Sequence, residues 1–303
     1  MGLTAIVLGA AAGGGFPQWN CLCPVCLLGW ARDRRALPRT QAGLAVSGDG
    51  ENWVLLNAAP DLRGQILATA QLHPRVSFGK VARDSPIQCV VLTGAEIDQT
   101  AGLLSLRERS PFTIVATPAT LATFADNPMF TVLDPELVPR RALVPGERVA
   151  IGAGLELELF PVPGKVPLYL EGKDAGRESD GMNVGVDLWA GEARLAYVPG
   201  AANVTPAMKA RLRRTDVVLF DGTLYTDDEM IRTGTGTKSG RRMGHMPIEG
   251  PDGSLAALAD LPGRRIFIHI NNTNPILIEG SQERARVEAA GWIVGEDGME
   301  IVL

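Results

Sequence analysis

The sequence predicts a layered α/β fold, in which helices pack against mostly buried strands. Short apolar runs recur along all 303 residues, and segments of helical composition lie between them. Several of the runs are continuously apolar, which is typical of central strands that are covered on both faces. No internal repeat and no long linker divides the chain. We therefore expect one domain that spans residues 1–303.

The elements follow from these patterns in chain order. Strands are predicted at residues 5–8, 53–56, 89–92, 112–116, 155–160, 194–198, 216–220 and 265–270. Helices are predicted at residues 60–70, 100–108, 117–127, 206–213, 254–260 and 281–290. The charged, glycine-containing segment 164–181 is interpreted as an excursion or lid over a site. Several strands end in a polar residue before a helix, where layered α/β folds keep their ligands.

Composition narrows the class of protein. A net charge of −5 gives no electrostatic reason to expect nucleic acid or an anionic membrane as a partner. No long apolar run predicts a transmembrane segment. The first residues lack the basic start of a signal peptide and are better explained as a strand. Thiolates that are available for metal suit a reducing compartment, so the cytoplasm is the expected location.

The most informative motif is a cysteine cluster that follows the glycine-rich turn at residues 9–15. Cys21, Cys23 and Cys26 lie within six residues. One short loop can direct three thiolates at one point, which suits a structural tetrahedral Zn²⁺ whose fourth ligand comes from elsewhere. The alternative is three free or buried cysteines, because a disulfide would leave one of them unpaired.

Acidic residues follow two of the apolar strands. Glu96 and Asp98 come after strand 89–92, and on extended chain they would point the same way. A helix that starts at residue 100 would direct its positive end at the same region. Asp221 ends strand 216–220. An aspartate at a strand end can also serve only as a helix cap.

Histidines occupy two further positions near strand ends. His245 lies in a loop between glycine and proline, and His269 lies on strand 265–270, before Asn271, Asn272 and Asn274. The simpler interpretation is a core histidine and asparagines that shape a turn. If the strands form one sheet, however, the polar groups converge on one edge, and we favour a functional site there.

The order of the motifs resembles the B family of pyrroloquinoline quinone (PQQ) biosynthesis proteins. The matching segments are the cysteine cluster, Thr-x-Ala-Glu-x-Asp at 93–98, Asp-Gly-Thr at 221–223, Gly-His-Met-Pro at 244–247 and His-Ile-Asn-Asn-Thr-Asn-Pro at 269–275. Segments 39–41 and 57–63 also look like that family. The resemblance covers essentially the whole chain. It implies the metallo-β-lactamase fold, an αββα four-layer sandwich, as a single domain.

The chain departs from the metal-binding signature of that superfamily. The His-x-His-x-Asp-His pattern falls on Gly94, Glu96, Asp98 and Gln99, and only the aspartate is kept. The B family commonly has histidine at the last position, so Gln99 affects the expected metal affinity. The chain holds three histidines in all, and segment 161–165 has none. A histidine-rich dinuclear zinc site therefore cannot be assembled, which argues against β-lactamase, phosphodiesterase or ribonuclease activity.

A different metal site can still be built from this chain. Two histidines and a carboxylate suit non-haem Fe²⁺ and oxygen chemistry. His245, His269 and one of Asp98 or Asp221 meet that count, with Glu96 and Gln99 as further catalytic candidates. The resemblance implies an iron-dependent hydroxylase that acts on the tyrosine ring of a Glu–Tyr precursor. Lys165 and Arg63 could anchor substrate carboxylates, although a solvated surface charge is the simpler interpretation of each.

His269 has two competing roles. In related phosphodiesterases with the same cysteine cluster, a histidine near this C-terminal strand completes the zinc site. If zinc takes His269, iron keeps His245 and carboxylates alone. If iron takes it, the zinc needs Asn272 or water as its fourth ligand. We expect His269 to face the catalytic side and Asn272 to lie near the zinc.

Two other functions remain open beside the hydroxylase. One is a non-enzymatic carrier that transports PQQ or its precursor, and the other is a metal-stabilised scaffold without activity. The expected partner is a tyrosine-containing dipeptide, a PQQ precursor or PQQ itself. The sequence is also compatible with a homodimer.

Overall fold

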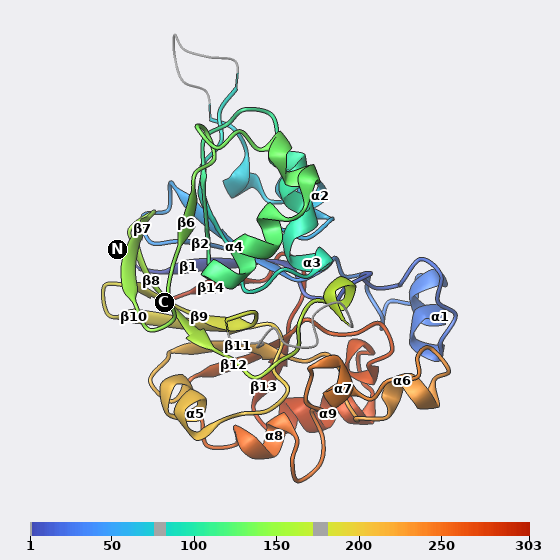
Figure 1. The fold of residues 1–303 in the computed structure, drawn as a ribbon. Helices are drawn as coiled ribbons and strands as arrows, with labels where there is room; N and C mark the ends of the chain where they lie inside the picture. Colours follow the sequence, from blue (N-terminus) through green and yellow to red (C-terminus); the bar gives the residue numbers. More distant parts are fainter. Residues whose placement is uncertain (1, 76–82, 172–180) are drawn as a thin grey trace.

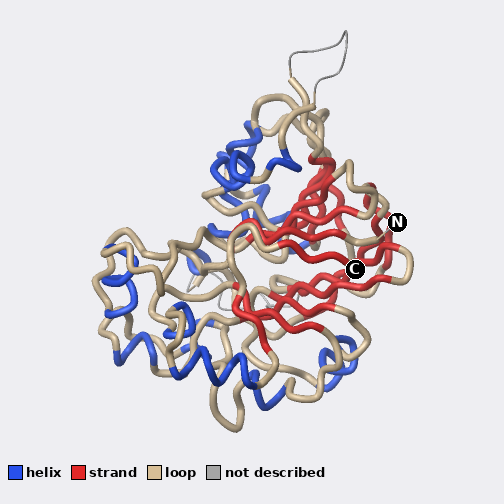
Figure 2. The backbone as a smooth tube through the Cα atoms, turned by 180° about the vertical axis from the view of Figure 1, so that it is seen from behind, coloured by secondary structure: helices blue, strands red, loops and turns tan. Residues whose placement is uncertain are grey.

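The computed structural model describes residues 2–75, 83–171 and 181–303. Two β-sheets lie face to face, and helices cover the outer face of each (Figures 1 and 2). The αββα sandwich that the resemblance implied is confirmed. The single sheet on which the convergence of the polar strand ends was conditional is not observed, because the strands that carry them belong to both sheets.

The first sheet combines the N-terminal half of the chain with its last strand. Its order is β14 (Glu300–Val302), β1 (Thr4–Gly9), β2 (Gly43–Ser47), β3 (Trp53–Leu56), β4 (Ile87–Val91), β5 (Thr113–Ala116) and β6 (Arg140–Ala142). Strands β3 to β6 run parallel to one another. The carboxyl end of β4 leads directly into residues 92–98.

The second sheet is built from the C-terminal half. Its order is β13 (Trp292–Val294), β12 (Arg264–Ile268), β11 (Val217–Asp221), β10 (Ala193–Val198), β9 (Val184–Ala190), β8 (Leu155–Pro161) and β7 (Arg148–Gly152). Strands β10 to β13 are parallel, so their carboxyl ends share one edge. Asp221 ends β11, and His269 follows β12.

Buried side chains divide into three layers that match this architecture. On β1, Ala5 and Val7 face the core between the sheets, whereas Ile6 and Leu8 face the helices outside. This alternation follows from the pleat of a strand. Both faces are apolar because both are covered, which explains the continuously apolar runs in the sequence.

Helices cover the outer faces and cap the strand ends. Outside the first sheet lie α2 (Leu62–Ala68), α3 (Ile97–Thr100) and α4 (Pro118–Ala125), with short 3₁₀ turns at Ala70–Leu72, Ala101–Leu106 and Pro128–Val132. On the side of the second sheet lie α1 (Pro24–Trp30), α5 (Pro206–Leu212), α6 (Glu229–Arg232), α7 (Gly240–Met243), α8 (Ser254–Ala257) and α9 (Gln282–Ala289). Further 3₁₀ turns are Leu168–Leu170 and Pro275–Leu277. Helix starts follow the expected chemistry: the Thr117 and Thr205 hydroxyls cap helices whose first residue is proline.

Several predicted boundaries are wrong near the site. Helix α3 begins at residue 97 rather than 100, so Glu96 is its N-cap and Asp98 lies in its first turn instead of on extended chain. The rest of the predicted helix is a 3₁₀ segment. Strand β12 ends one residue before His269. Helix α8 covers only the first part of predicted segment 254–260.

The predicted lid falls partly outside the described residues, because 172–180 are not among them. Its described part, 164–171, follows β8 and lies against the β4–α3 segment through Leu168 and Tyr169. None of the helices described is long and apolar enough to cross a bilayer.

Candidate functional site

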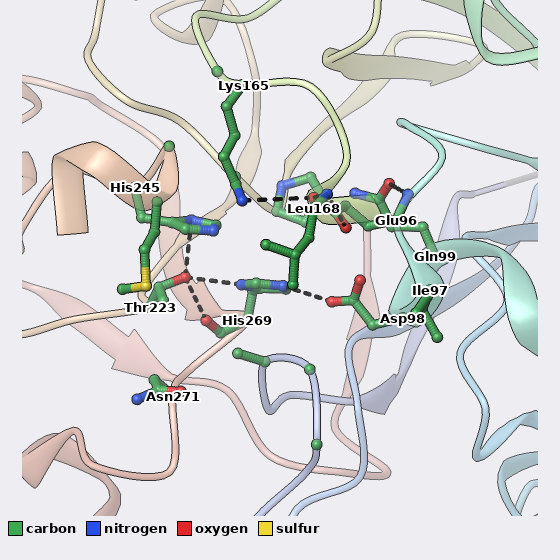
Figure 3. Close-up of a pocket in the computed structure, with 18 of the residues that line it drawn as sticks. Glu96, Ile97, Asp98, Gln99, Lys165, Leu168, Thr223, His245, His269 and Asn271 are labelled. Atoms are coloured by element: carbon green, nitrogen blue, oxygen red, sulfur yellow. Dashed lines mark hydrogen bonds and ion pairs between the residues drawn. The ribbon is translucent and has the colours of Figure 1, made fainter. Parts of the chain in front are cut away.

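A cavity of about 650 Å³ opens where the carboxyl ends of β4, β11 and β12 meet. Five of the six predicted catalytic residues line it, from both halves of the chain (Figure 3). They are Glu96, Asp98, Gln99, His245 and His269. The sixth, Asp221, is fully buried and does not line the cavity.

His269 joins the two sheets across the cavity floor. Its Nε2 donates to Asp98 Oδ2 at 3.0 Å, and the two residues follow strands of opposite sheets, His269 after β12 and Asp98 in α3 after β4. Burial favours the neutral acid, but the hydrogen bond and charge of His269 lower the pKa of Asp98 below its ordinary value. Burial likewise opposes a charged imidazole, yet the same pair raises the pKa of His269. The two groups form a charge-assisted pair.

Asp221 orients the second histidine from behind. Its Oδ2 accepts from the backbone N–H of Ala201 at 2.8 Å and from His245 Nδ1 at 2.8 Å. Its Oδ1 accepts from the backbone and hydroxyl of Thr223 at 3.0 and 2.6 Å. Although burial opposes the charged form, His245 and Thr223 lower the pKa of this carboxyl. All four acceptor positions are filled by protein donors.

Thr223 connects both imidazoles to that carboxylate. Its Oγ1 lies 3.0 Å from His245 Nδ1 and 2.8 Å from His269 Nδ1 (Figure 3). A hydroxyl has one proton, and the shortest contact of this one is Asp221 Oδ1. When it donates there, it can accept from His269 Nδ1–H, while the single proton on His245 Nδ1 is shared between Thr223 Oγ1 and the nearer Asp221 Oδ2. The rings stack with their centroids 5.1 Å apart.

The backbone at His269 adopts a conformation that is uncommon for residues other than glycine. Its φ is +55°, in the left-handed region, immediately after β12. The Thr223 hydroxyl also lies 3.0 Å from the carbonyl oxygen of His269. Strained backbone of this kind is concentrated at functional sites, where surrounding contacts hold it in place.

Gln99 has a structural role at the start of α3. Its Oε1 accepts from the backbone N–H of Glu96 at 3.1 Å, which forms half of a capping box. A Cβ on Gly94 would lie 2.5 Å from this oxygen and 3.0 Å from the carbonyl of Met182. The amide therefore fills the space in front of residue 94, where the superfamily signature places its first histidine.

Glu96 and Lys165 lie above the floor. The Glu96 carboxylate accepts from the backbone N–H of Leu168 at 3.1 Å, and the Lys165 ammonium lies 4.0 Å from it (Figure 3). Burial, together with Asp98, raises the pKa of Glu96. Lys165 lines the cavity, whereas Arg63 is an exposed residue outside it.

The three predicted zinc ligands form a second cluster. The sulfurs of Cys21, Cys23 and Cys26 lie within 4.8 Å of one another. Burial raises the pKa of Cys23 to about 12 and also raises that of Cys26, so these thiols ionise at neutral pH only beside a cation. Sulfurs around a tetrahedral Zn²⁺ lie about 3.8 Å apart, so the cluster fits this ion.

Asn272 lies at the open side of the cysteine cluster. Its amide nitrogen is 3.2 Å from the sulfurs of Cys21 and Cys26 and 3.9 Å from that of Cys23. The oxygen and nitrogen of an amide can be exchanged by a flip, which would direct Oδ1 at an ion there. His269 points away, towards Asp98. The structure thus places His269 and Asn272 as expected, although their roles as ligands stay predictions.

Sequence reasoning missed two residues that the site uses, Thr223 and Lys238. Thr223 was noticed only as part of the Asp-Gly-Thr motif, although its distance of two residues from Asp221 is a signal for a local side-chain bond. Lys238 lines the cavity, and nothing in the sequence around it indicates this; Asn271, named among the polar residues after His269, lines it as well. Asn274 matches its simpler interpretation, since it caps the 3₁₀ turn at Pro275.

Comparison with known families and proteins agrees with this geometry. Residues 52–270 match the model of the β-lactamase superfamily domain. Coenzyme PQQ synthesis protein B of Methylobacterium nodulans is 55% identical over 304 residues, which cover 99% of this chain and 100% of that protein. The protein of the same name from Rhizobium meliloti is 54% identical, with 99% and 98% covered.

Solved structures show the same relationship. The 1.98 Å crystal structure of Zn²⁺-bound PqqB from Methylobacterium extorquens superposes with a TM-score of 0.94 at 53% identity, covering 99% of this chain and 100% of that one. A diphosphatase from the PhnP family shares the fold with a TM-score of 0.71 at 19% identity, covering 100% and 98%. Together, the motifs, the sandwich and near-complete coverage at more than half identity show that this chain belongs to the coenzyme PQQ synthesis protein B family.

Proposed function

We propose that this protein acts in PQQ synthesis by hydroxylating the tyrosine ring of a Glu–Tyr precursor with Fe²⁺ and O₂. The observation that supports this proposal is the donor set of the cavity. His245, His269 and Asp98 line the cavity, Asp98 contacts His269, and both imidazoles have a ring nitrogen within 4.8 Å of the buried Asp221 carboxylate behind them. Two imidazoles with carboxylates suit non-haem iron and leave positions open for substrate.

The spacing of Asp98 and His269 fits neighbouring ligands of an octahedral ion. Their facing atoms are 3.0 Å apart. Ligands at about 2.1 Å and at right angles around an ion lie about 3.0 Å from each other. Asp221 has all its acceptor positions filled, so we assign the ligand role to Asp98 and an orienting role to Asp221.

The residues around the two imidazoles determine which ring nitrogen carries the proton. Thr223 and Asp221 face the Nδ1 atoms of both imidazoles, which keeps those protons on Nδ1. The Nε2 atoms would then be left for coordination, once His269 Nε2 has given up the proton that it donates to Asp98. Bound iron with O₂ would supply the oxidation. The chain itself positions the phenol, and apolar residues such as Ile97 and Leu168 line the same cavity.

The cysteine cluster is assigned a separate, structural Zn²⁺. Cys21, Cys23 and Cys26 provide three sulfurs, and Asn272 the fourth position. A sulfur-rich site with a closed coordination shell has no open position for substrate. The cytoplasm is the proposed location, since it keeps these thiols reduced.

Single-turnover chemistry tests the hydroxylase. Zinc-loaded protein is supplied with Fe²⁺, a reductant, O₂ and the Glu–Tyr dipeptide, and the product is analysed by mass spectrometry. One atom of O₂ should enter the ring and the other should leave as water, with the reductant supplying the electrons. We expect ¹⁸O₂ to label the product, and His245→Ala to abolish the labelling.

His73→Ala is the matched control, because His73 is exposed and does not line the cavity. It should label the product like the unaltered protein. If iron-loaded protein adds no oxygen, or if His245→Ala is as active as His73→Ala, the hydroxylase proposal is wrong.

A carrier of PQQ or its precursor is the second candidate. It is favoured by the way the polar groups of the cavity floor already pair with one another, His269 with Asp98 and His245 with Asp221. A carrier should bind PQQ equally well with and without iron. A hydroxylase should bind its phenolic substrate without iron and more tightly when iron is present.

A further inference from the structure

Two lysines from separate segments meet at the mouth of the cavity. Lys165 follows β8, and Lys238 lies between α6 and α7; both line the cavity. The Glu171 carboxylate lies between them, with Oε1 2.7 Å from the Lys165 ammonium and Oε2 2.5 Å from that of Lys238. One carboxylate thus bridges two cations at the entrance.

Lys165 is held in place by its surroundings. The Asn183 amide donates to its backbone carbonyl at 2.5 Å, and its side chain packs against Gly244, where a Cβ would approach Lys165 Cγ to 3.1 Å. Gly244 also has φ +88° and directly precedes His245. This ammonium is therefore tied to the segment that carries a proposed iron ligand, and its side chain is only 27% exposed.

The bond that Glu171 makes is easy to exchange. Its side chain is about one-third exposed, at 32%, and it does not line the cavity, whereas both lysines do. The two ammonium groups lower its pKa to about 2, so it is charged at neutral pH. Ion pairs open to water add little to stability, since solvent screens them. A ligand carboxylate that gains further contacts inside the cavity can therefore replace it.

We propose that Lys165 and Lys238 form a carboxylate subsite for the small acid that enters the cavity, and that Glu171 fills this subsite until the ligand displaces it. This inference rests on the proposed function, because it assigns the acidic groups of the same ligand. A carboxylate at this subsite leaves the rest of a small molecule to extend towards His245 and His269. Both ligand candidates carry this chemistry, since Glu–Tyr has two carboxylates and PQQ has three.

Binding measured by calorimetry tests the subsite without turnover. Zinc-loaded protein without added iron is titrated with Glu–Tyr, with Gln–Tyr-amide as its analogue without carboxylates, and with PQQ. We expect Lys238→Met and Lys165→Met each to weaken binding of the acids by about tenfold, the scale of a hydrogen bond to a charged group, and to leave Gln–Tyr-amide unaffected. Glu171→Gln removes the competitor and should tighten binding of the acids.

Lys209→Met is the matched control. It removes the same charge from a lysine of similar exposure, 30%, which pairs with Asp260 outside the cavity. It should change no affinity. Thermal melting and zinc content check that each variant is folded.

The outcomes separate this inference from the proposed reaction. Lysine-dependent binding of Glu–Tyr without ¹⁸O incorporation would keep the subsite and refute the hydroxylase. Lysine-dependent binding of PQQ alone would keep the subsite and favour the carrier. If neither acid binds more weakly to the lysine variants than to Lys209→Met, or if Glu171→Gln weakens binding, the inference is wrong, whatever the activity.

Discussion

The Thr223 hydroxyl organises the site by contacting three of its ionisable residues. It contacts Asp221 and both imidazoles, and all of these contacts are within 3.0 Å. The histidines and aspartates could be predicted from the sequence because ionisable groups are unusual after apolar strands. A threonine carries no such signal, since most threonines bond locally or to water.

Replacing Thr223 should loosen both histidines at once. We expect Thr223→Val to weaken Fe²⁺ binding by about 10- to 100-fold, the scale found for groups that orient metal ligands. Thr223→Ser keeps the hydroxyl and should retain most of the affinity. Anaerobic titration with Fe²⁺ measures both. Equal affinity in the two variants would show that the hydroxyl does not position the rings.

Glu229 should make stability depend on pH. It is buried, accepts from the Thr273 hydroxyl at 2.5 Å and from the Tyr225 backbone N–H at 2.7 Å, and burial raises its pKa from 4.5 to about 7. The folded protein therefore holds this proton more tightly than the unfolded chain. The resulting stabilisation is full below about pH 4.5 and is lost as pH rises through about 7.

The Glu229→Gln variant cannot lose that proton. Between about pH 5 and 8, we expect the free energy of unfolding of the unaltered protein to fall by about 1–3 kcal/mol relative to that of this variant. Urea titrations at both pH values measure the difference. Glu136→Gln, at an exposed position, should track the unaltered protein. A constant offset between the Glu229→Gln and unaltered curves would contradict the assignment.

At the scale of elements, the segment from β4 to α3 shows why sequence reasoning was wrong about the backbone at the site. Alternating Glu96 and Asp98 suggested extended chain, but the capping box between Glu96 and Gln99 starts the helix early. The pattern Glu-x-x-Gln can cap a helix, yet Ser or Thr is the usual first residue, so the signal was weak. The eight predicted strands lie close to observed strands, because their apolar runs are set by burial on both faces. The strands β2, β6, β7, β9, β13 and β14 were not predicted.

Substitutions at Gly94 and Gln99 should have non-additive effects on the free energy of unfolding. We expect Gly94→Ala to displace the Gln99 amide and break the cap, at a cost of about 1–2 kcal/mol. Gln99→Ala removes the obstructing group, so Gly94→Ala should cost less in that background. A double-mutant cycle by urea unfolding measures the coupling. Strictly additive effects would show that the amide does not occupy the space in front of residue 94.

At the scale of the whole molecule, the sandwich brings residues that are distant in sequence together in one cavity. Asp98 and His269 are 171 positions apart in the sequence, yet their side chains form a hydrogen bond with each other. Continuous apolar strands indicate that both faces are covered, but they do not reveal whether a helix or a second sheet covers them. The prediction of four layers therefore came from the family resemblance. The division of the strands into two sheets could not be predicted from the residues alone.

The cysteine cluster should stabilise the entire fold, because it fixes the N-terminal loop to the segment around Asn272. We expect Cys26→Ala to lose zinc and to lower the melting temperature by roughly 5 °C or more. Cys89→Ala alters a buried cysteine inside β4, away from the cluster, and should keep its zinc. Metal content and calorimetry measure both. Full zinc occupancy in Cys26→Ala would rule out this ligand.

The close succession of His269 and Asn272 has a thermodynamic consequence. One short stretch of backbone serves both proposed metals, and it begins with a residue at φ +55°. Binding of Zn²⁺ to the cysteine cluster would restrict the motion of this stretch. The His269 imidazole would then lose less conformational entropy when it binds iron. By reciprocity, iron in the cavity must then strengthen the hold on zinc by the same factor. The affinity of the protein for each ion would thus depend on whether the other ion is bound.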